Sequence, residues 1–406
     1  MPLNALVDPE ALKFVNRGPT TPAEWALFAV GLTIVALTAV DLTRSLVITR
    51  WSNTPISRVV RRVVETFANV VARRFSSYHR RDAIRAWTGA FIIVGSLATW
   101  LLCFLVGYSF MMRGLISLDF GTAIREAGSS LFTLGFATVD RERLSYIDFM
   151  AAATGPITIG LMISYLPTIY SAYNTREIDV ALLKSPFGEP NWGPEILARQ
   201  SELGFSSDRS LAFWREWERW AVNVAESHTT YSVLIFMRSS RPMRSWSVAL
   251  LSVLDAAAMT TSLQPDSNHA AVRVFLRQGI ECVHDLASVL RLKEEKIHSG
   301  DSPINLTKEE FLQACQMLSD RGLTFERSPQ EAWPFFRDWR RMYERQLYEM
   351  TRKLDAVPAY WSGPRSPVTP EVAPTRRFYD VSSDGGLTYP IDAPEPKRHR
   401  RKRQLG

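Results

Sequence analysis

The sequence has few cysteines and none of the short motifs that mark the commonest catalytic sites. Its three cysteines, Cys103, Cys282 and Cys315, lie far apart and offer no CxxC pair and no disulfide framework. No GxGxxG, GxxxxGK[ST], HExxH or GxSxG string occurs, and the histidines lack metal-ligand spacing. We therefore expect no catalytic residues, no metal site and no cofactor, and a membrane enzyme is the least favoured class of function.

Long hydrophobic runs are scarce in the second half of the chain, and nearly all of them fall before residue 174. Residues 87–112 and 149–173 carry no charged side chain and are long enough to cross a bilayer. A third run, 25–48, is interrupted by Asp41 and Arg44. A signal peptide is the alternative for this run, but no basic n-region precedes it and no small-residue cleavage site follows cleanly. We predict three transmembrane helices.

Positive charge is concentrated between the first two predicted spans. Residues 44–85 hold ten arginines against two acidic residues. The positive-inside rule places this basic loop, 49–85, in the cytoplasm. The N-terminal segment 1–24 is then extracellular and everything after residue 174 is cytoplasmic. We expect a multi-pass protein of the plasma membrane.

Within the basic loop, residues 55–75 have the period of an amphipathic helix, with valines on one face and arginines on the other. Such a helix can lie on the anionic inner leaflet of the membrane. The residues predicted to contact lipid are Arg58, Arg61, Arg62 and Arg73. The alternative is a helix packed on the cytoplasmic domain.

The stretch between the last two spans is too short for a domain and too apolar for a simple loop. Residues 119–132 predict a short helix, and the residues up to 138 predict extended backbone around Gly135. Irregular backbone at membrane depth is tolerated only where it lines a water-filled path or is buried in protein. The pattern therefore predicts a re-entrant segment.

Span, short helix, Thr133-Leu134-Gly135-Phe136-Ala137 and span together resemble the pore domain of the potassium-channel family, whose filter reads Thr-Val-Gly-Tyr-Gly. The resemblance covers about residues 86–174. It implies that backbone carbonyls of this string, with the Thr133 hydroxyl, bind potassium or another monovalent cation. It also implies a homotetramer, because four such loops surround the ion.

Two positions depart from the family pattern. Ala137 stands where the family has its second glycine, and Thr138 stands where an aspartate usually follows. A Cβ at the first position penalises left-handed backbone by about 1 kcal/mol. A non-selective cation channel, and a non-conducting membrane sensor or scaffold, are therefore the alternatives.

The third span contains a possible gating hinge. Gly155, Pro156 and Gly160 resemble the glycine hinge that the family places after its filter, and Pro167 offers a second kink. No span carries arginines at every third position, so the usual voltage sensor is absent from the sequence.

The rest of the chain predicts a connector and a soluble helical domain. Prolines and glycines break residues 175–195, and residues 195–355 show helical periodicity throughout. The apolar run 246–263 is predicted to be a buried core helix, because it is short and contains Asp255. A fourth transmembrane span is the alternative interpretation of this run. This domain is expected to assemble the tetramer or to sense an unknown signal.

Residues 356–406 predict a disordered tail with a basic end at 397–403. Anionic lipid is its expected partner, and nucleic acid is not expected. The predicted fold class is an all-α membrane protein with three transmembrane helices, a re-entrant pore helix and filter, and a helical cytoplasmic domain.

Overall fold

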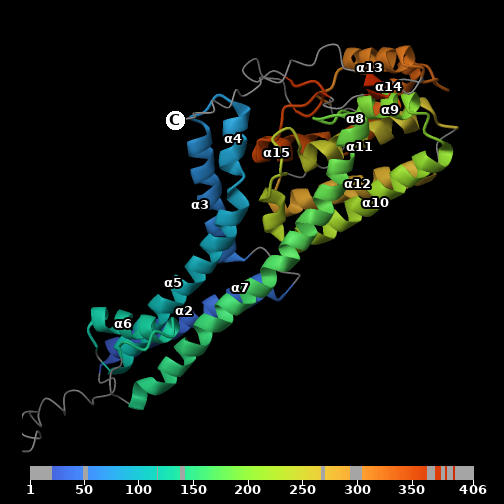
Figure 1. The fold of residues 1–406 in the computed structure, drawn as a ribbon. Coiled ribbons are helices and arrows are strands. Elements are labelled where there is room, and N and C mark those ends of the chain that lie inside the picture. Colours follow the sequence, from blue (N-terminus) through green and yellow to red (C-terminus); the bar gives the residue numbers. More distant parts are fainter. Residues whose placement is uncertain are drawn as a thin grey trace, which may run out of the picture. The chain divides into compact units, whose positions relative to one another are not determined.

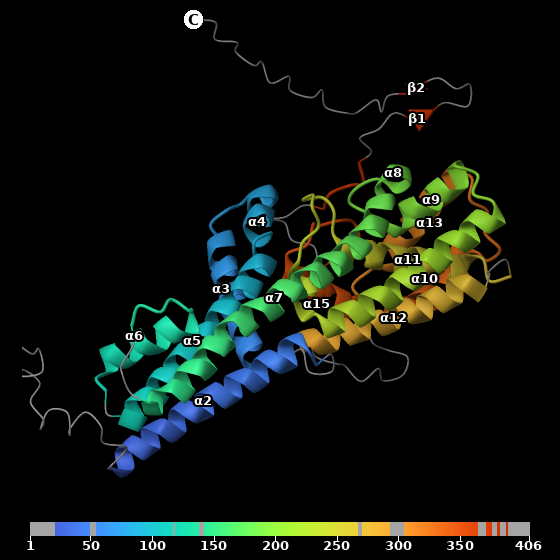
Figure 2. The ribbon, with the colours of Figure 1, turned by 60° about the horizontal axis from the view of Figure 1, so that its bottom comes forward.

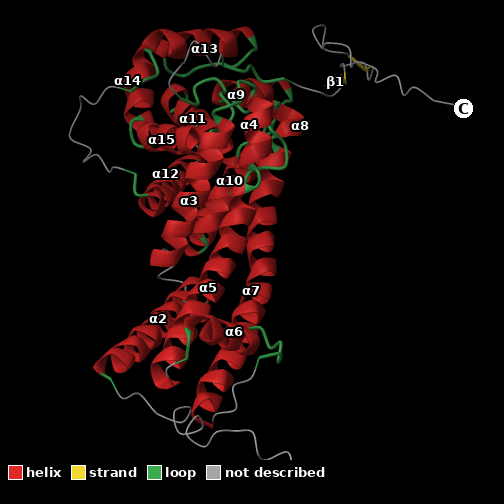
Figure 3. Cartoon of the chain, turned by 90° about the vertical axis from the view of Figure 1, so that its left-hand side faces the viewer, coloured by secondary structure: helices red, strands yellow, loops and turns green. Residues whose placement is uncertain are grey.

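The computed structural model describes residues 21–48, 54–116, 118–137, 142–266, 270–292, 304–363, 371–375, 380–381 and 387–388. These residues are almost entirely α-helical (Figure 3), and β1 (Asp380–Val381) pairs antiparallel with β2 (Leu387–Thr388). The chain divides into two compact units. Unit 1 falls within residues 1–175, 223–238 and 288–291, and unit 2 within 176–222, 239–287 and 292–406.

Unit 1 is built mainly from the first part of the chain (Figure 1). Its helices are α2 (Pro22–Leu46), α3 (Pro55–Ala72), α4 (Tyr78–Arg85), α5 (Thr88–Ile116), α6 (Phe120–Leu131), most of α7 (Glu142–Leu182) and the 3-10 helix η2 (Ser232–Phe236).

Unit 2 contains the later helices. These are α8 (Lys184–Phe187), α9 (Gly193–Glu202), most of α10 (Ser207–Thr230), α11 (Trp246–Leu263), most of α12 (Ala270–Leu290), α13 (Lys308–Asp320), α14 (Pro329–Arg340) and α15 (Glu344–Leu354).

Four helices, α2, α5, α7 and α11, are long and apolar enough to cross a membrane, which indicates a multi-pass membrane protein. They differ in how much of their apolar stretch the protein itself covers. That fraction is 28% for α2, 28% for α5 and 22% for α7, but 89% for α11. The first three thus leave apolar surface available to lipid, whereas α11 is enclosed by unit 2 as a core helix would be.

The backbones of helices α2 and α5 come close together where each helix has a glycine, Gly31 and Gly107. A Cβ built on Gly31 of α2 would lie 2.5 Å from the carbonyl oxygen of Gly107 in α5. Close backbone approach at small residues is the usual basis of helix packing in membranes, where lipid provides no hydrophobic drive for helices to associate. Figure 2 shows α2 and α5 running beside each other.

The buried carboxylate of Asp41 in α2 joins three helices. It accepts hydrogen bonds from the indole N–H of Trp100 in α5 (2.9 Å), from the Thr54 hydroxyl (3.1 Å) and from the backbone N–H of Ile56 (3.2 Å). Thr54 is the N-cap of α3 but makes no side-chain cap bond itself. Asp41 therefore caps α3 from another helix, where a negative charge is also favoured by the helix dipole.

Replacing Asp41 by alanine should detach the start of α3. The change leaves the N–H groups of buried Trp100 and half-buried Ile56 without their acceptor, and a buried unsatisfied donor costs about 1–3 kcal/mol. We expect the free energy of unfolding to fall by roughly 3 kcal/mol, measured in detergent, with faster proteolysis between α2 and α4. Thr43→Ala is the control, because the Thr43 hydroxyl bonds only the Ala39 carbonyl of its own helix. Equal unfolding of the two variants would contradict the capping role.

Unit 2 has a buried charged centre around Arg340 of α14, which has no exposed side-chain surface. Its guanidinium pairs with Asp255 of α11 at 2.5 Å and with Glu344 of α15 at 2.6 Å. It also donates to the backbone carbonyl of Trp361 at 2.9 Å. Breaking such a buried pair typically costs 3–5 kcal/mol, so these contacts hold α11, α14, α15 and residue 361 together.

Three boundaries differ from those expected from the sequence. Helix α7 continues to Leu182, beyond the predicted end at 173, because no proline or glycine lies between Pro167 and its last residue. Pro194 lies in the first turn of α9, where a missing N–H costs little, and does not interrupt a helix. Val357, Ala359 and Trp361 are buried, so the packed chain extends past 356.

Candidate ion-binding site

The segment that carries the candidate site follows α6. The Asp119 carboxylate caps α6 by accepting hydrogen bonds from the Thr122 backbone N–H (2.9 Å) and hydroxyl (2.6 Å). Both hydrogen bonds lower the pKa of Asp119, and the bond from the Thr122 hydroxyl has the larger effect. Helix α6 packs against α5, and its Ala123 and Ala127 side chains are fully buried. Figure 2 shows the two helices next to each other.

Helix α6 ends in a two-bond Schellman motif. The Leu134 N–H donates to the Ser129 carbonyl (2.8 Å) and the Thr133 N–H donates to the Ser130 carbonyl (3.0 Å). This geometry places Thr133 in the left-handed region, with φ of 54°. Glycine is usual at this position, and a β-branched residue there is strained by about 1–2 kcal/mol. Strain of this kind is concentrated at functional sites.

The residues after the turn fold back along the end of α6. Gly135 is also left-handed, with φ of 66°. The Ala137 backbone N–H donates to the Ser129 hydroxyl at 3.1 Å, and the Thr133 hydroxyl donates to the Phe132 carbonyl at 2.8 Å. Ser129 thus holds two points of the segment, Leu134 through its carbonyl and Ala137 through its hydroxyl.

The backbone carbonyls of this segment lack hydrogen-bond partners in the part of the chain that the structure describes. Among the described residues, no hydrogen bond reaches the carbonyl oxygens of Thr133, Leu134, Gly135 and Phe136. The segment is also exposed on unit 1, with Leu134 at 61% and Phe136 at 62% of full exposure. Four consecutive unpaired carbonyls beside the negative end of a helix form an arrangement that attracts cations.

Helix α7 fixes the end of α6 from the other side. A Cβ built on Gly155 would lie 1.9 Å from the Leu131 carbonyl oxygen, so only glycine allows this contact. The Ser130 hydroxyl donates to Asp148 of α7 at 2.7 Å, and the hydroxyls of Tyr108 and Thr154 lie 2.7 Å apart. The last turn of α6 is therefore held between α5 and α7.

The residues predicted as a gating hinge lie in one uninterrupted helix. Helix α7 passes through Pro156 and Pro167 without a break. A Cβ at Gly160 would meet nothing within 4 Å, in contrast to Gly155. Gly155 thus has a packing role that its position in the sequence did not reveal. The space beside Gly160 is empty, so Gly160 has no such role.

The arginines predicted to contact lipid are not equivalent. Arg62 and Arg73 are exposed and Arg58 is half-buried. Arg61 differs, because only 14% of its side chain is exposed and its guanidinium lies over the ring of Phe236, 5.6 Å from the centroid. Thr138 and the basic end 397–403 lie outside the described residues.

Sequence reasoning missed Ser129, Ser130, Asp148 and Tyr108, which support the segment. The pair Ser129-Ser130 carried a usable signal, since serine is disfavoured inside helices and favoured where a helix ends. Asp148 and Tyr108 could be found only from the tertiary contacts.

No family model, curated protein or solved structure matches this chain. Among the described residues, no cluster of three His, Cys, Asp or Glu side chains could hold a metal ion.

Two glycines of α7 give a matched test of the contact between α6 and α7. Gly155→Ala places a methyl group on the Leu131 carbonyl and should lower the free energy of unfolding by about 1–3 kcal/mol, as overpacking does. Gly160→Ala adds the same methyl group in open space and should leave the melting temperature unchanged or raised. Equal melting of the two variants in detergent would show that α7 does not approach α6 here.

A second pair tests the backbone conformation of the segment. Thr133→Gly removes a β-branched residue from left-handed backbone and should raise the free energy of unfolding by about 1 kcal/mol. Gly135→Ala introduces a Cβ into the same region and should lower it by a similar amount. Chemical denaturation of the two purified variants measures both signs, and reversed signs would contradict the assigned φ angles.

Proposed function

We propose that the chain is one subunit of a homotetrameric cation channel that conducts potassium. The observation that carries the proposal is the set of unpaired carbonyls of Thr133, Leu134, Gly135 and Phe136, with the Thr133 hydroxyl at its inner end. Carbonyl oxygens in a ring replace the hydration shell of a cation, and a ring needs several copies of one loop. Exposure of the segment on a single subunit supports its place at a symmetry axis.

In this proposal α2, α5 and α7 cross the plasma membrane and α6 is a re-entrant pore helix. The nine arginines between α2 and α5, with Arg44 in the last turn of α2, favour a cytoplasmic position for that loop, which puts the N-terminus outside and unit 2 inside. The negative end of α6 then points towards the ion path, where it favours a cation. Helix α11 is a core helix of the cytoplasmic part.

A non-selective cation channel is the second candidate, and Ala137 favours it. Its methyl group stands where the resembling family has glycine, which limits the backbone conformations of the outer end of the filter. The Ser129 hydroxyl is the only partner of the Ala137 N–H among the described residues. A loosened outer end would pass potassium and sodium alike.

We further propose that α3 lies on the anionic inner leaflet. Four large side chains on one of its faces, Val59, Val63, Phe67 and Val70, are 53–68% exposed. The exposed arginines Arg62 and Arg73 flank this stripe. An apolar stripe beside a basic one is the surface of an interfacial helix. The side of α3 that carries Val60 and Ala72 is buried against the rest of unit 1.

Ion flux from liposomes that contain the purified protein tests the function directly. We expect potassium flux well above sodium flux, abolished by Gly135→Val because a β-branched residue is excluded from φ of 66°. Gly204→Val is the matched control. Gly204 of unit 2 is also left-handed, at 60°, and like Gly135 has no atom within 4 Å of a built Cβ.

The outcomes separate the candidates. Equal potassium and sodium fluxes would establish the non-selective channel. Ion flux that is unchanged in Gly135→Val would show that the ions do not pass along this segment. If purified tetramers pass neither ion, even when Gly155 or Pro167 is replaced, a non-conducting membrane sensor or scaffold is the remaining interpretation.

A further inference from the structure

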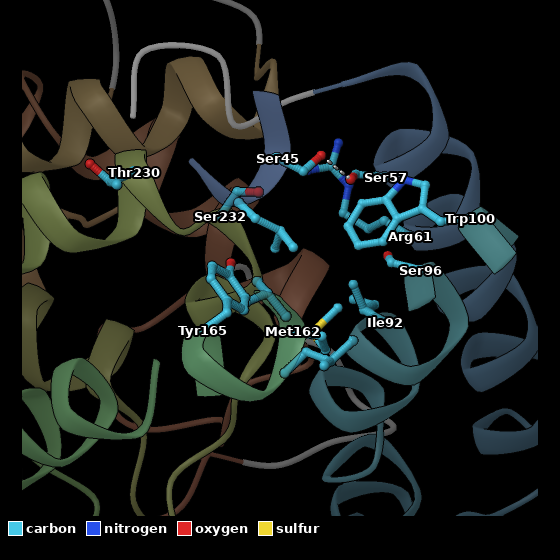
Figure 4. Close-up of a pocket in the computed structure, with 13 residues that line it drawn as sticks. Ser45, Ser57, Arg61, Ile92, Ser96, Trp100, Met162, Tyr165, Thr230 and Ser232 are labelled. Atoms are coloured by element: carbon cyan, nitrogen blue, oxygen red, sulfur yellow. Dashed lines mark hydrogen bonds between the residues drawn. The ribbon is translucent and has the colours of Figure 1, made fainter. Parts of the chain in front are cut away.

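Unit 1 contains a cavity that the proposed ion path does not use. It has a volume of about 50 Å³ and lies among α2, α3, α5, α7 and the residues around η2. Most of the polar residues that line it carry a hydroxyl group: Ser45, Ser57, Ser96, Tyr165, Thr230 and Ser232. Figure 4 shows Arg61, Ser57 and Ser96 on one side and Tyr165 and Ser232 on the other. Among the described residues that line it, none is acidic.

Arg61 brings a poorly compensated positive charge to this cavity. Its nearest carboxylate oxygen, on Glu65, lies 3.6 Å from Nε, beyond hydrogen-bond distance. Its other contact among the described residues is the ring of Phe236. A guanidinium has five N–H donors in a planar fork, and most of those of Arg61 have no acceptor among the residues that the structure describes.

The surroundings increase this excess of positive charge. Burial lowers the pKa of Arg61, and the charges of Arg291, Arg58 and Arg62 lower it further, against the opposing effect of Glu65. Three further arginines therefore add positive charge around Arg61, against the single carboxylate of Glu65. The Asp41 carboxylate also lies beside the cavity wall, but it is already hydrogen-bonded by Trp100 and Thr54. In a site of low dielectric such an imbalance favours a bound anion over water.

The wall of the cavity is fixed in place. The Ser45 and Ser57 hydroxyls lie 3.2 Å apart, and Ser45 also lies 2.8 Å from Thr54. The segment that contains Thr230 and Ser232 is tied to α4, because Arg238 donates to Asp82 at 2.5 Å and to the Tyr78 hydroxyl at 3.0 Å. The hydroxyl groups are thus presented by a preformed site.

The size of the cavity limits the ligand. One ordered water needs about 10–15 Å³ of such volume, so the cavity holds the equivalent of roughly four waters. Four oxygens around one centre is the composition of a phosphate group. Arginine and hydroxyl donors are the groups that proteins use to bind phosphate.

We propose that this cavity binds a phosphate group, with the Arg61 guanidinium as its cationic ligand and the hydroxyls of Ser57 and Ser96 as further donors. The phosphate belongs either to a phospholipid headgroup of the inner leaflet or to a soluble phosphate. The lipid source rests on the orientation in the proposed function, because Ser45 lies in the last turn of α2, next to the basic loop. The phosphate chemistry itself does not depend on that orientation.

Thermal unfolding of the purified full chain in neutral detergent tests the proposal. The probes are inorganic phosphate, dioleoyl phosphatidic acid in mixed micelles, and dioleoylglycerol, which lacks the phosphate. A ligand that binds the folded state raises the melting temperature in proportion to its affinity. We expect phosphatidic acid to raise it, dioleoylglycerol not to, and Arg61→Gln to weaken the apparent affinity roughly ten- to a hundred-fold.

Two further variants keep the test decisive. Arg215→Gln removes the same charge from an exposed position on α10 of unit 2, outside the cavity and outside the proposed lipid-facing helix, and should bind as the wild type does. Ser96→Leu fills the cavity without changing any charge and should lose binding even if Arg61→Gln does not fold. A response to inorganic phosphate alone supports the site with a soluble source. Phosphatidic acid binding that is unchanged in both Arg61→Gln and Ser96→Leu would overturn it, whether or not the protein conducts ions.

Discussion

The contact between the end of α6 and Gly155 of α7 is the constraint on which the candidate site depends. The Leu131 carbonyl occupies the place where any other residue would carry its Cβ, so the distance between the two helices is fixed by one missing methyl group. Once α6 ends there, its Schellman turn determines where the following residues go. Ser130 and Asp148 secure the same junction with a hydrogen bond. The free carbonyls are therefore positioned by packing between helices and not by their own loop.

Much of the local structure could be predicted from the sequence, because it depends on neighbouring residues. Asp119 begins a short helix before the first apolar turn, the arginine-valine pattern of residues 55–75 gives α3, and uncharged runs give α2, α5 and α7. Contacts across the chain could not be predicted in this way. In the sequence Asp41 only interrupts an apolar run, yet in the fold it caps α3 and accepts a hydrogen bond from Trp100, 59 positions away in the sequence. Nothing in its neighbours indicates that partner, since the bond exists only once α2 and α5 are packed.

Helix α3 shows how tertiary packing divides a surface that the sequence presents as simple. The helical period separates valines from arginines into two faces. In the folded chain there are three, because unit 1 covers a strip that includes Val60 and turns Arg61 inward. The valines that stay outside and the arginines that flank them keep the character of an interfacial helix. Arg61, of the same residue type and on the same helix, is left beside a cavity where its charge has a different use.

The unpaired carbonyls also bear on how the protein is made. A polar backbone group in hydrocarbon costs several kcal/mol when it lacks a partner, and a single chain offers four of them in succession. In the proposed homotetramer this segment would face water at the symmetry axis, so a newly synthesised chain would have to keep it away from lipid tails until the other copies arrive. Membrane insertion would then be coupled to subunit encounter, and a chain with an altered segment would be expected to disable the mixed assembly that it joins.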